Sequence, residues 1–301
     1  MASVWDISIG NFQRYLKLEK GLAANSVESY LHDIRLLRQY AEPRSLQPAD
    51  ITLSHLQEFL ARLNELSIAI NTQCRLISGW RMFFRMLVID DDIPENPAEM
   101  LVMPQRSKHL PDVLTDDEIT AIQNTFDRSF PDQERNYVII EVLYGCGLRV
   151  SELVNLTLSN IFPEDSCLLI MGKGSKQRWV PINDHALKLL LSYIHNVRSH
   201  IAPVAGQEKY VFLNRRGSHL SRNYVFMFLK DAVKKANISK QVSPHSLRHS
   251  FATELVQNGA DLRVVQELLG HESISTTEIY THLSRQYLRD TISTFHPHYR
   301  K

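Results

Sequence analysis

A short segment near residue 245 combines side chains that bind phosphate with the start of a predicted helix. Ser243 is a favourable N-cap, and Pro244 suits the first helical position. His245 and Arg248 are three residues apart, so they share one face of the first turn. The free N–H groups at a helix N-terminus also favour an anion. The segment therefore predicts a phosphate site, with a capped helix and a surface arginine as the alternative.

A histidine and a tyrosine follow this segment in the chain. Gly270 is predicted to end a helix, which places His271 in a short loop. Tyr280 falls in the next short helix, for which Ser275 and Glu278 form a capping signature. Taken alone, such a tyrosine is more often a half-buried packing residue, and such a histidine is more often hydrogen-bonded within its loop.

Two earlier segments add charged candidates. Arg149 and Glu152 follow the glycines of 145–147 and lie three residues apart on a predicted helix, so they can pair. Lys173 lies between the two glycines of 172–174, at the tip of a predicted hairpin. The alternatives are a surface ion pair for the first segment and a solvated turn for the second.

The first hundred residues predict an all-α module that would position part of a site. Residues 1–103 contain four amphipathic helical patterns and no strand signal. Asn25 and Glu28 are expected to cap the second of these helices. Residues 104–113 are polar, contain prolines and lack periodicity, so they predict an interdomain linker.

Residues 114–301 predict a second, mixed α/β domain. The run 167–171 and the run 179–182 read as two strands of an antiparallel hairpin. Helices are expected around them, and the last one covers roughly 284–294 with an apolar stripe. The expected ranges of the other helices are 115–126, 133–144, 184–197, 222–235, 245–257 and 262–269. The whole chain is therefore expected to be mainly α, with one small antiparallel sheet.

Composition limits the function classes without pointing to one. The 301 residues are 44% apolar, enough for two buried cores, and carry a net charge of +1. The net charge is −3 for residues 1–105 and +4 for the remainder, so binding to DNA would need local basic surfaces. The absence of an 18-residue apolar run, a signal peptide and paired cysteines predicts a cytoplasmic protein with no membrane span.

The combination of these segments resembles the tyrosine recombinase, or phage integrase, family and, within it, the Xer recombinases. The segments appear in the family order and spread over the second domain, and the helical first domain resembles the family's SAM-like core-binding domain. The D-type paralogue is favoured over the C-type. The matching segments are 147–153, 172–178, 243–249, 259–266 and 268–271, together with Tyr280 and the His296-Pro297 pair.

The resemblance implies that Arg149 and Arg248 hold the non-bridging oxygens of a pentacoordinate phosphorane. Guanidiniums suit this task because they stay charged and bind phosphate bidentately. By the same resemblance, Glu152 orients Arg149 from the second layer of the site.

The remaining roles are also implied by the resemblance. Tyr280 would be the nucleophile that forms a 3′-phosphotyrosyl bond, and His245 would be a base or phosphate ligand. His271 would hydrogen-bond the phosphorane, and Lys173 would protonate the departing 5′-hydroxyl. Because the covalent ester preserves the bond energy, neither ATP nor another high-energy cofactor is expected. No metal is expected either, because no residue set in this site resembles a metal cage.

The family further implies the partners. These are a double-stranded DNA recombination site, a homo- or hetero-tetramer with a paralogous recombinase, and a DNA translocase of the division machinery. The last helix is expected to dock on a neighbouring protomer, so that deletion of 285–301 would impair assembly. The expected biological role is the resolution of chromosome dimers at cell division.

Three alternatives remain open from the sequence. A metal-dependent nuclease would use His245 and His249, which are spaced i, i+4 but lack an acidic ligand cluster nearby. A DNA-binding regulator on a recombinase scaffold would perform no chemistry. A transposon integrase or an inversion switch of the same family would have an identical active site.

Overall fold

The computed structural model describes residues 3–104, 112–172, 177–270 and 285–299. Side chains 285–289 and that of Tyr299 are outside this description. The chain forms two compact units, Met1–His109 and Leu110–Lys301, each with its own hydrophobic core.

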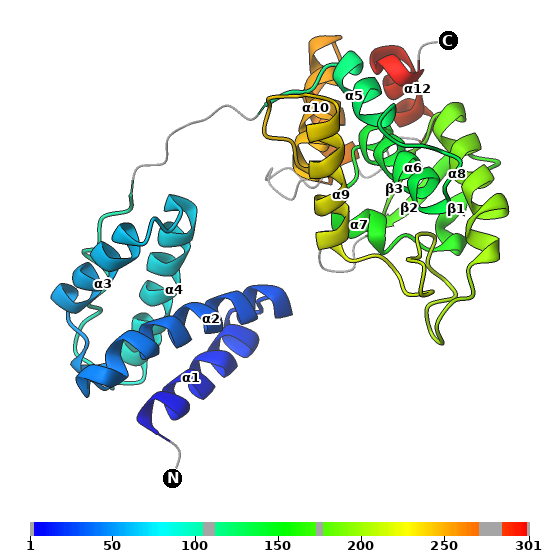
Figure 1. Ribbon diagram of the computed structural model, residues 1–301. Helices are drawn as coiled ribbons and strands as arrows, with labels where there is room; N and C mark the ends of the chain where they lie inside the picture. Colours follow the sequence, from blue (N-terminus) through cyan, green and yellow to red (C-terminus); the bar gives the residue numbers. More distant parts are fainter. Residues whose placement is uncertain (1–2, 105–111, 173–176, 271–284, 300–301) are drawn as a thin grey trace. The chain divides into compact units, whose positions relative to one another are not determined.

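Unit 1 is built from helices alone in its described residues (Figure 1). Their bounds are α1 Val4–Arg14, extended by a π-helical turn Tyr15–Glu19, then α2 Ala24–Ala41, α3 Leu53–Glu65 and α4 Ile70–Ile89. The expected cap at Asn25 is wrong: α2 begins after Ala23, which makes no side-chain cap bond. The Ala23 carbonyl accepts the Val27 N–H at 3.1 Å, so Asn25 already lies inside the first turn.

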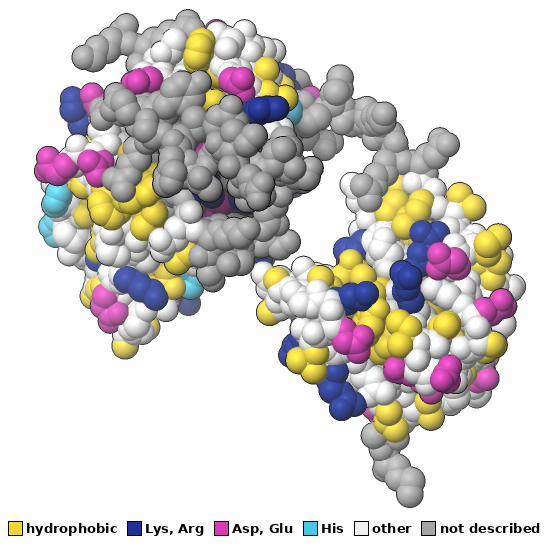
Figure 2. Space-filling model, turned by 180° about the vertical axis from the view of Figure 1, so that it is seen from behind, with side chains coloured by type: hydrophobic (Ala, Val, Ile, Leu, Met, Phe, Trp, Pro, Cys, Tyr) yellow, Lys and Arg dark blue, Asp and Glu magenta, His cyan; other side chains and the backbone are white. Residues whose placement is uncertain are grey.

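Aromatic side chains fill the core of unit 1. Phe12 of α1 and Phe83 of α4 pack in a T-shaped arrangement, with ring centroids 5.3 Å apart. Trp5 is also buried, and its indole N–H donates to the Leu46 carbonyl at 3.0 Å. The visible face of the unit shows Lys and Arg side chains interspersed with acidic and apolar ones (Figure 2).

Unit 2 is mixed α/β, as expected, with one three-stranded antiparallel sheet of order β1-β2-β3. Leu169 of β2 pairs with Trp179 of β3, which confirms the predicted hairpin. Strand β1 was not expected from the sequence. The bounds are α5 Asp116–Gln123, α6 Pro131–Cys146, α7 Val150–Val154, β1 Ile161–Phe162, β2 Cys167–Met171, β3 Gln177–Pro181, α8 Asp184–Asn196, α9 Arg222–Lys235, α10 Pro244–Gln257, α11 Leu262–Leu269 and α12 Arg285–Phe295.

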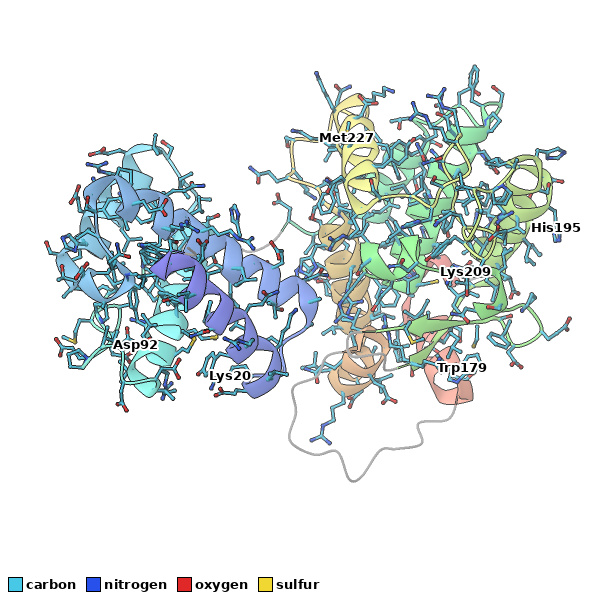
Figure 3. The ribbon with its side chains drawn as sticks, turned by 90° about the horizontal axis from the view of Figure 1, so that it is seen from below. Lys20, Asp92, Trp179, His195, Lys209 and Met227 are labelled. Atoms are coloured by element: carbon cyan, nitrogen blue, oxygen red, sulfur yellow. The ribbon has the colours of Figure 1, made fainter. Side chains whose placement is uncertain are left out.

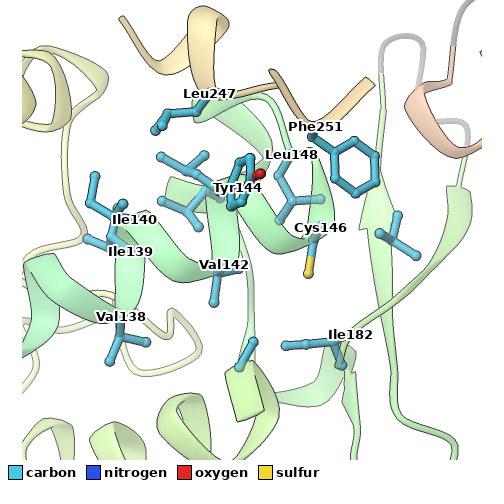
Figure 4. Close-up of a cluster of buried hydrophobic side chains, with 14 of the residues drawn as sticks. Val138, Ile139, Ile140, Val142, Tyr144, Cys146, Leu148, Ile182, Leu247 and Phe251 are labelled. Atoms are coloured by element: carbon cyan, nitrogen blue, oxygen red, sulfur yellow. The ribbon is translucent and has the colours of Figure 1, made fainter. Parts of the chain in front are cut away.

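Helix α6 runs through the core of unit 2 and is buried on nearly every side (Figure 4). Val138, Val142 and Cys146 are at most 1% exposed, and Leu247 and Phe251 of α10 pack on the same cluster. Because α6 is rigidly enclosed, its C-terminal end is a firm base for the residues that follow it.

Surface helices cover this core with one apolar face each. Helix α9 buries Val225 and Leu229, whereas Met227 points outward and is 71% exposed (Figure 3). Helix α12 buries Ile292 completely in the core of its own unit. None of the described helices is long and apolar enough to cross a membrane.

The start of unit 2 is tied to the loop that precedes α10. Asp112 accepts the Gln241 N–H at 2.9 Å, and the Val113 carbonyl accepts Lys240 Nζ at 2.8 Å. Most of the expected linker, 105–111, lies outside the described residues.

Candidate active site

A sharp turn after α6 positions the first candidate arginine. Gly147 ends the helix with φ +59°, in the left-handed region that favours glycine. A Cβ at this position would lie 2.4 Å from Cδ1 of Phe251, so glycine also permits close packing with α10. The chain then restarts as α7, for which Arg149 is the N-cap residue.

The carboxylate of Glu152 lies at the centre of the candidate site. Its side chain is only 4% exposed. Oε2 accepts the backbone N–H of Arg149 at 2.8 Å, and Oε1 accepts Nη1 of Arg149 at 2.9 Å. The predicted pair between Arg149 and Glu152 is therefore present, but it is mostly buried on the carboxylate side rather than a surface ion pair.

A third arginine, which the sequence reasoning gave no role, binds the same carboxylate. Arg178 of β3 donates from Nη1 to Oε1 of Glu152 at 2.8 Å and from Nη2 to Oε2 at 2.9 Å. This fork is the bidentate geometry that guanidinium forms with carboxylate. The signal that could have found it is its place in the 172–178 motif.

Arg248 reaches the same place from α10. Ser243 caps this helix and Pro244 is in its first turn, as predicted. Nη1 of Arg248 donates to the Gly147 carbonyl at 2.7 Å and lies 3.8 Å from Oε2 of Glu152. Its side chain is 5% exposed, whereas that of Arg149 is 39% exposed. Arg149 is thus the more accessible of the two predicted anion ligands.

The C-terminal end of α11 completes the cluster. Three consecutive carbonyls accept from three arginines: Leu268 from Nε of Arg178 at 2.9 Å, Leu269 from Nη2 of Arg248, and Gly270 from Nη2 of Arg149 at 3.1 Å. Gly270 has φ +64° and closes the helix, as expected. Carbonyls at a helix C-terminus lack partners within the helix and attract cations, so this end is a natural dock for guanidiniums.

The crowding of charge shifts the pKa values of the site. Burial, and then the charge of Arg149, lowers the pKa of Arg248 to about 10, which leaves it protonated near neutral pH. Burial raises the pKa of Glu152, but the bonds from Arg178 and Arg149 outweigh it, so the net pKa is below its ordinary value. Glu152 is therefore an anion among cations.

His245 lies on the exposed side of α10, one turn from Arg248. Partial desolvation lowers its pKa, and the charges of Arg248, His249 and Arg149 lower it further. The ring is therefore neutral near pH 7 and able to accept a hydrogen bond or a proton.

The described residues bring Arg149, Glu152 and Arg248 together, with His245 close enough to feel their charge. The other three candidates, Lys173, His271 and Tyr280, lie outside the described residues. Within the ranges that the structure describes, no group of three or more His, Cys, Asp or Glu side chains could hold a metal ion.

Comparison with known proteins matches each unit to a family model. The profile described as "Phage integrase family" matches residues 112–287, and "Phage integrase, N-terminal SAM-like domain" matches residues 9–90. The tyrosine recombinase XerD of Staphylococcus aureus is 37% identical over 290 residues, which cover 96% of this chain and 98% of the relative. The Staphylococcus epidermidis protein of the same name is 36% identical over the same length.

Solved structures share the fold. The Tn1549 transposon integrase (residues 82–397), in complex with circular intermediate DNA, has a TM-score of 0.72 at 22% identity, covering 94% of this chain and 98% of that one. The XerH recombinase, bound to a palindromic difH substrate after cleavage, has a TM-score of 0.68 at 23% identity, covering 95% and 84%.

Proposed function

Because the chain belongs to the phage integrase family, and within it to the Xer-type tyrosine recombinases, we propose that Tyr280 attacks a DNA phosphate held by Arg149 and Arg248. The enzyme cleaves and rejoins DNA at specific sites. The observation that carries the catalytic assignment is that Arg248 of α10 meets Arg149 and Glu152 at the start of α7, about a hundred residues away in the chain.

The two guanidiniums would stabilise the extra charge of the phosphorane. Each guanidinium has five N–H donors, and Arg248 uses two of them on carbonyls of the described chain. Donors therefore remain for phosphate oxygens, and Arg149 is exposed enough to receive the anion first. Electrostatic stabilisation of this kind is usually the largest contribution to such a reaction.

Proton transfer would fall to side chains around this anion site. A tyrosine with an ordinary pKa of about 10 needs a proton acceptor to attack at neutral pH. His245 is suited to this task or to phosphate binding because its lowered pKa keeps it neutral. Lys173 would protonate the departing 5′-oxygen, which leaves as a hydroxyl, and His271 would hydrogen-bond the phosphorane.

The tyrosyl phosphodiester conserves the energy of the cleaved bond, so strand exchange would need neither ATP nor another cofactor. The substrate would be a double-stranded recombination site; in support, the XerH structure is bound to a palindromic difH substrate and the Tn1549 integrase structure to circular intermediate DNA. Unit 1 matches the SAM-like domain and would bind the duplex together with unit 2. Binding through phosphates predicts an affinity that falls steeply with salt.

The biological role would be the resolution of chromosome dimers at cell division, in the cytoplasm, as a D-type paralogue. The relatives named XerD favour this role over integration of a transposon, because they are 37% identical over nearly the whole chain. A paralogous recombinase would complete the tetramer, and a DNA translocase of the division machinery would activate it. Cells lacking the protein should accumulate chromosome dimers, with rescue by the wild type and not by Tyr280→Phe.

The last helix would dock on a neighbouring protomer, although part of it serves its own unit. Ile292 is fully buried there, and the Phe295 carbonyl accepts Nδ2 of Asn258 at 2.8 Å. Deletion of 285–301 would therefore remove core packing as well as any docking contact. Thr294→Arg, on an exposed position of α12, is the cleaner probe: we expect fewer tetramers on DNA with an unchanged melting temperature.

The decisive experiment is trapping on a nicked half-site suicide substrate. The wild type and Tyr287→Phe, which alters the next tyrosine in the chain, should form a covalent protein–DNA adduct. Tyr280→Phe should form none. An adduct from Tyr280→Phe would refute the choice of nucleophile, and no adduct from the wild type would refute the catalytic assignment and favour a DNA-binding regulator.

Adduct formation by the wild type should be unchanged in EDTA. Its loss would favour a metal-dependent nuclease.

A further inference from the structure

Among the three arginines of the cluster, Arg178 has the side chain with the most hydrogen bonds in the described part of the chain. Its guanidinium forms two bonds to the Glu152 carboxylate and one to the Leu268 carbonyl. A Cβ on Gly270 would lie 3.2–3.4 Å from Cδ, Nε and Nη1 of Arg178, so the end of α11 rests directly on this side chain. At 14% side-chain exposure, Arg178 is less open to an incoming phosphate than Arg149.

The charges of the cluster do not cancel. Three guanidiniums surround one carboxylate, which leaves a formal charge of +2. Arg178 takes both oxygens of Glu152, while Arg248 stays at 3.8 Å from the nearer one. Without the charge of Arg178, the carboxylate of Glu152 would offset part of the positive charge of Arg149 and Arg248, and the formal charge of the cluster would fall to +1. The pKa shift of Glu152 agrees, because among the groups that lower it Arg178 ranks before Arg149.

The same side chain connects the carboxylate to the segment that carries two other proposed site residues. Leu268 is in the last turn of α11, and His271 and Tyr280 follow in the chain. A buried fork that binds both a carboxylate and this turn therefore fixes the last described turn before that segment.

We propose that Arg178 is a positioning residue of the recombinase site. It binds Glu152, so that the positive charge of Arg149 and Arg248 is not offset by this carboxylate and is available to the scissile phosphate. It also holds the last turn of α11. The proposal rests on the proposed function. Arg178 acts through Glu152 and α11 and does not touch the reacting atoms.

The test measures adduct formation in a single turnover, separately from affinity for the half-site. Arg178→Gln should slow adduct formation by about 10- to 100-fold, the size of the effect of removing a group that orients a metal ligand. Half-site affinity should change by less than about threefold, because many phosphate contacts share it.

The double variant Glu152→Gln/Arg178→Gln tests the charge argument. It removes one cation and one anion, so the formal charge returns to +2. We expect it to form adduct at least about threefold faster than Arg178→Gln alone, whereas purely structural losses would accumulate. A double variant that is no faster than Arg178→Gln would overturn the proposal, as would an Arg178→Gln variant with the wild-type rate.

Arg198→Gln is the matched control. Arg198 is also buried in unit 2, but in the described part of the chain it donates to the Tyr210 and Glu208 carbonyls and not to Glu152. It should lower the melting temperature without a selective loss of rate. If Arg178→Gln does not melt cooperatively, Arg178→Lys is used in its place. Lysine keeps the positive charge but cannot form the two parallel bonds to the carboxylate. A rate of adduct formation about 3- to 10-fold below wild type, with unchanged half-site affinity, would therefore support the proposal. A wild-type rate, or a parallel loss of affinity, overturns it.

These outcomes separate the two proposals. No adduct from the wild type refutes the proposed function. Adduct from the wild type, together with an unaffected Arg178→Gln, refutes only the role of Arg178.

Discussion

Substitution of Gly147 by alanine should destabilise unit 2 through two separable effects. The residue has φ +59°, and the left-handed conformation costs a non-glycine residue roughly 1–2 kcal/mol. The new Cβ would lie 2.4 Å from Cδ1 and 2.7 Å from Cε1 of Phe251, a fully buried ring. Forcing such a ring to move costs about 1–3 kcal/mol. The expected total loss is therefore about 2–5 kcal/mol.

Gly206→Ala isolates the steric contribution. Gly206 also has a positive φ, +81°, but a Cβ there would meet no atom within 4 Å. Hydrogen exchange of α6 amides is the suitable assay, because it reports the opening of unit 2 separately from unit 1. Gly147→Ala should lose about 1–3 kcal/mol more than Gly206→Ala. Equal losses in the two variants would refute the steric argument.

The same variant should also affect the site. The Gly147 carbonyl accepts Nη1 of Arg248 at 2.7 Å, and Arg149 follows two residues later. A shift of this turn would displace both guanidiniums, so Gly147→Ala should form adduct more slowly than Gly206→Ala. Equal rates would mean that the turn can relax without moving the arginines.

Two further predictions concern buried charges of unit 2. Nδ1 of His298 lies 3.2 Å from Oε1 of Glu141. Burial lowers the pKa of His298, but Glu141 and then Asp116 outweigh burial, so the pKa is raised overall. The stabilisation by protonated His298 is therefore complete below its ordinary pKa of about 6.5 and is lost as pH rises through the raised pKa. The stability difference between wild type and His298→Gln should therefore be largest in mild acid and shrink in alkali, and a difference independent of pH would contradict this. Glu152→Gln should cost about 3–5 kcal/mol because it leaves buried arginines without their anion. Asp231→Asn, which breaks an exposed i, i+4 pair, should cost about 0.5 kcal/mol or less, and similar losses in the two variants would count against a buried network.

Local signals in the sequence predicted most of the secondary structure of unit 2. The ranges 222–235 and 262–269 agree with α9 and α11, and Ser243 caps α10 as its residue type predicts. These features succeed because caps and helical periodicity depend on residues a few positions apart. In unit 1, the predicted cap at Asn25 is wrong because residue type alone does not fix where a helix begins: a suitable side chain is present, but α2 already begins at Ala24.

The two-residue strand β1 shows the limit of that local reading. Ile161–Phe162 is too short to carry an alternating pattern, and it becomes a strand only because it pairs with Leu168 and Cys167 of β2.

The sequence by itself determined which residue types could act on a phosphate, and its motifs identified the family. Only the tertiary structure decided that Glu152 is shared by three arginines and that Arg178 belongs to the site. Arg149 and Gly270 are separated by 121 positions, and Arg178 and Leu268 by 90. Contacts over such distances follow from how helices pack around α6, and neither periodicity nor capping, which act over a few residues, can specify them.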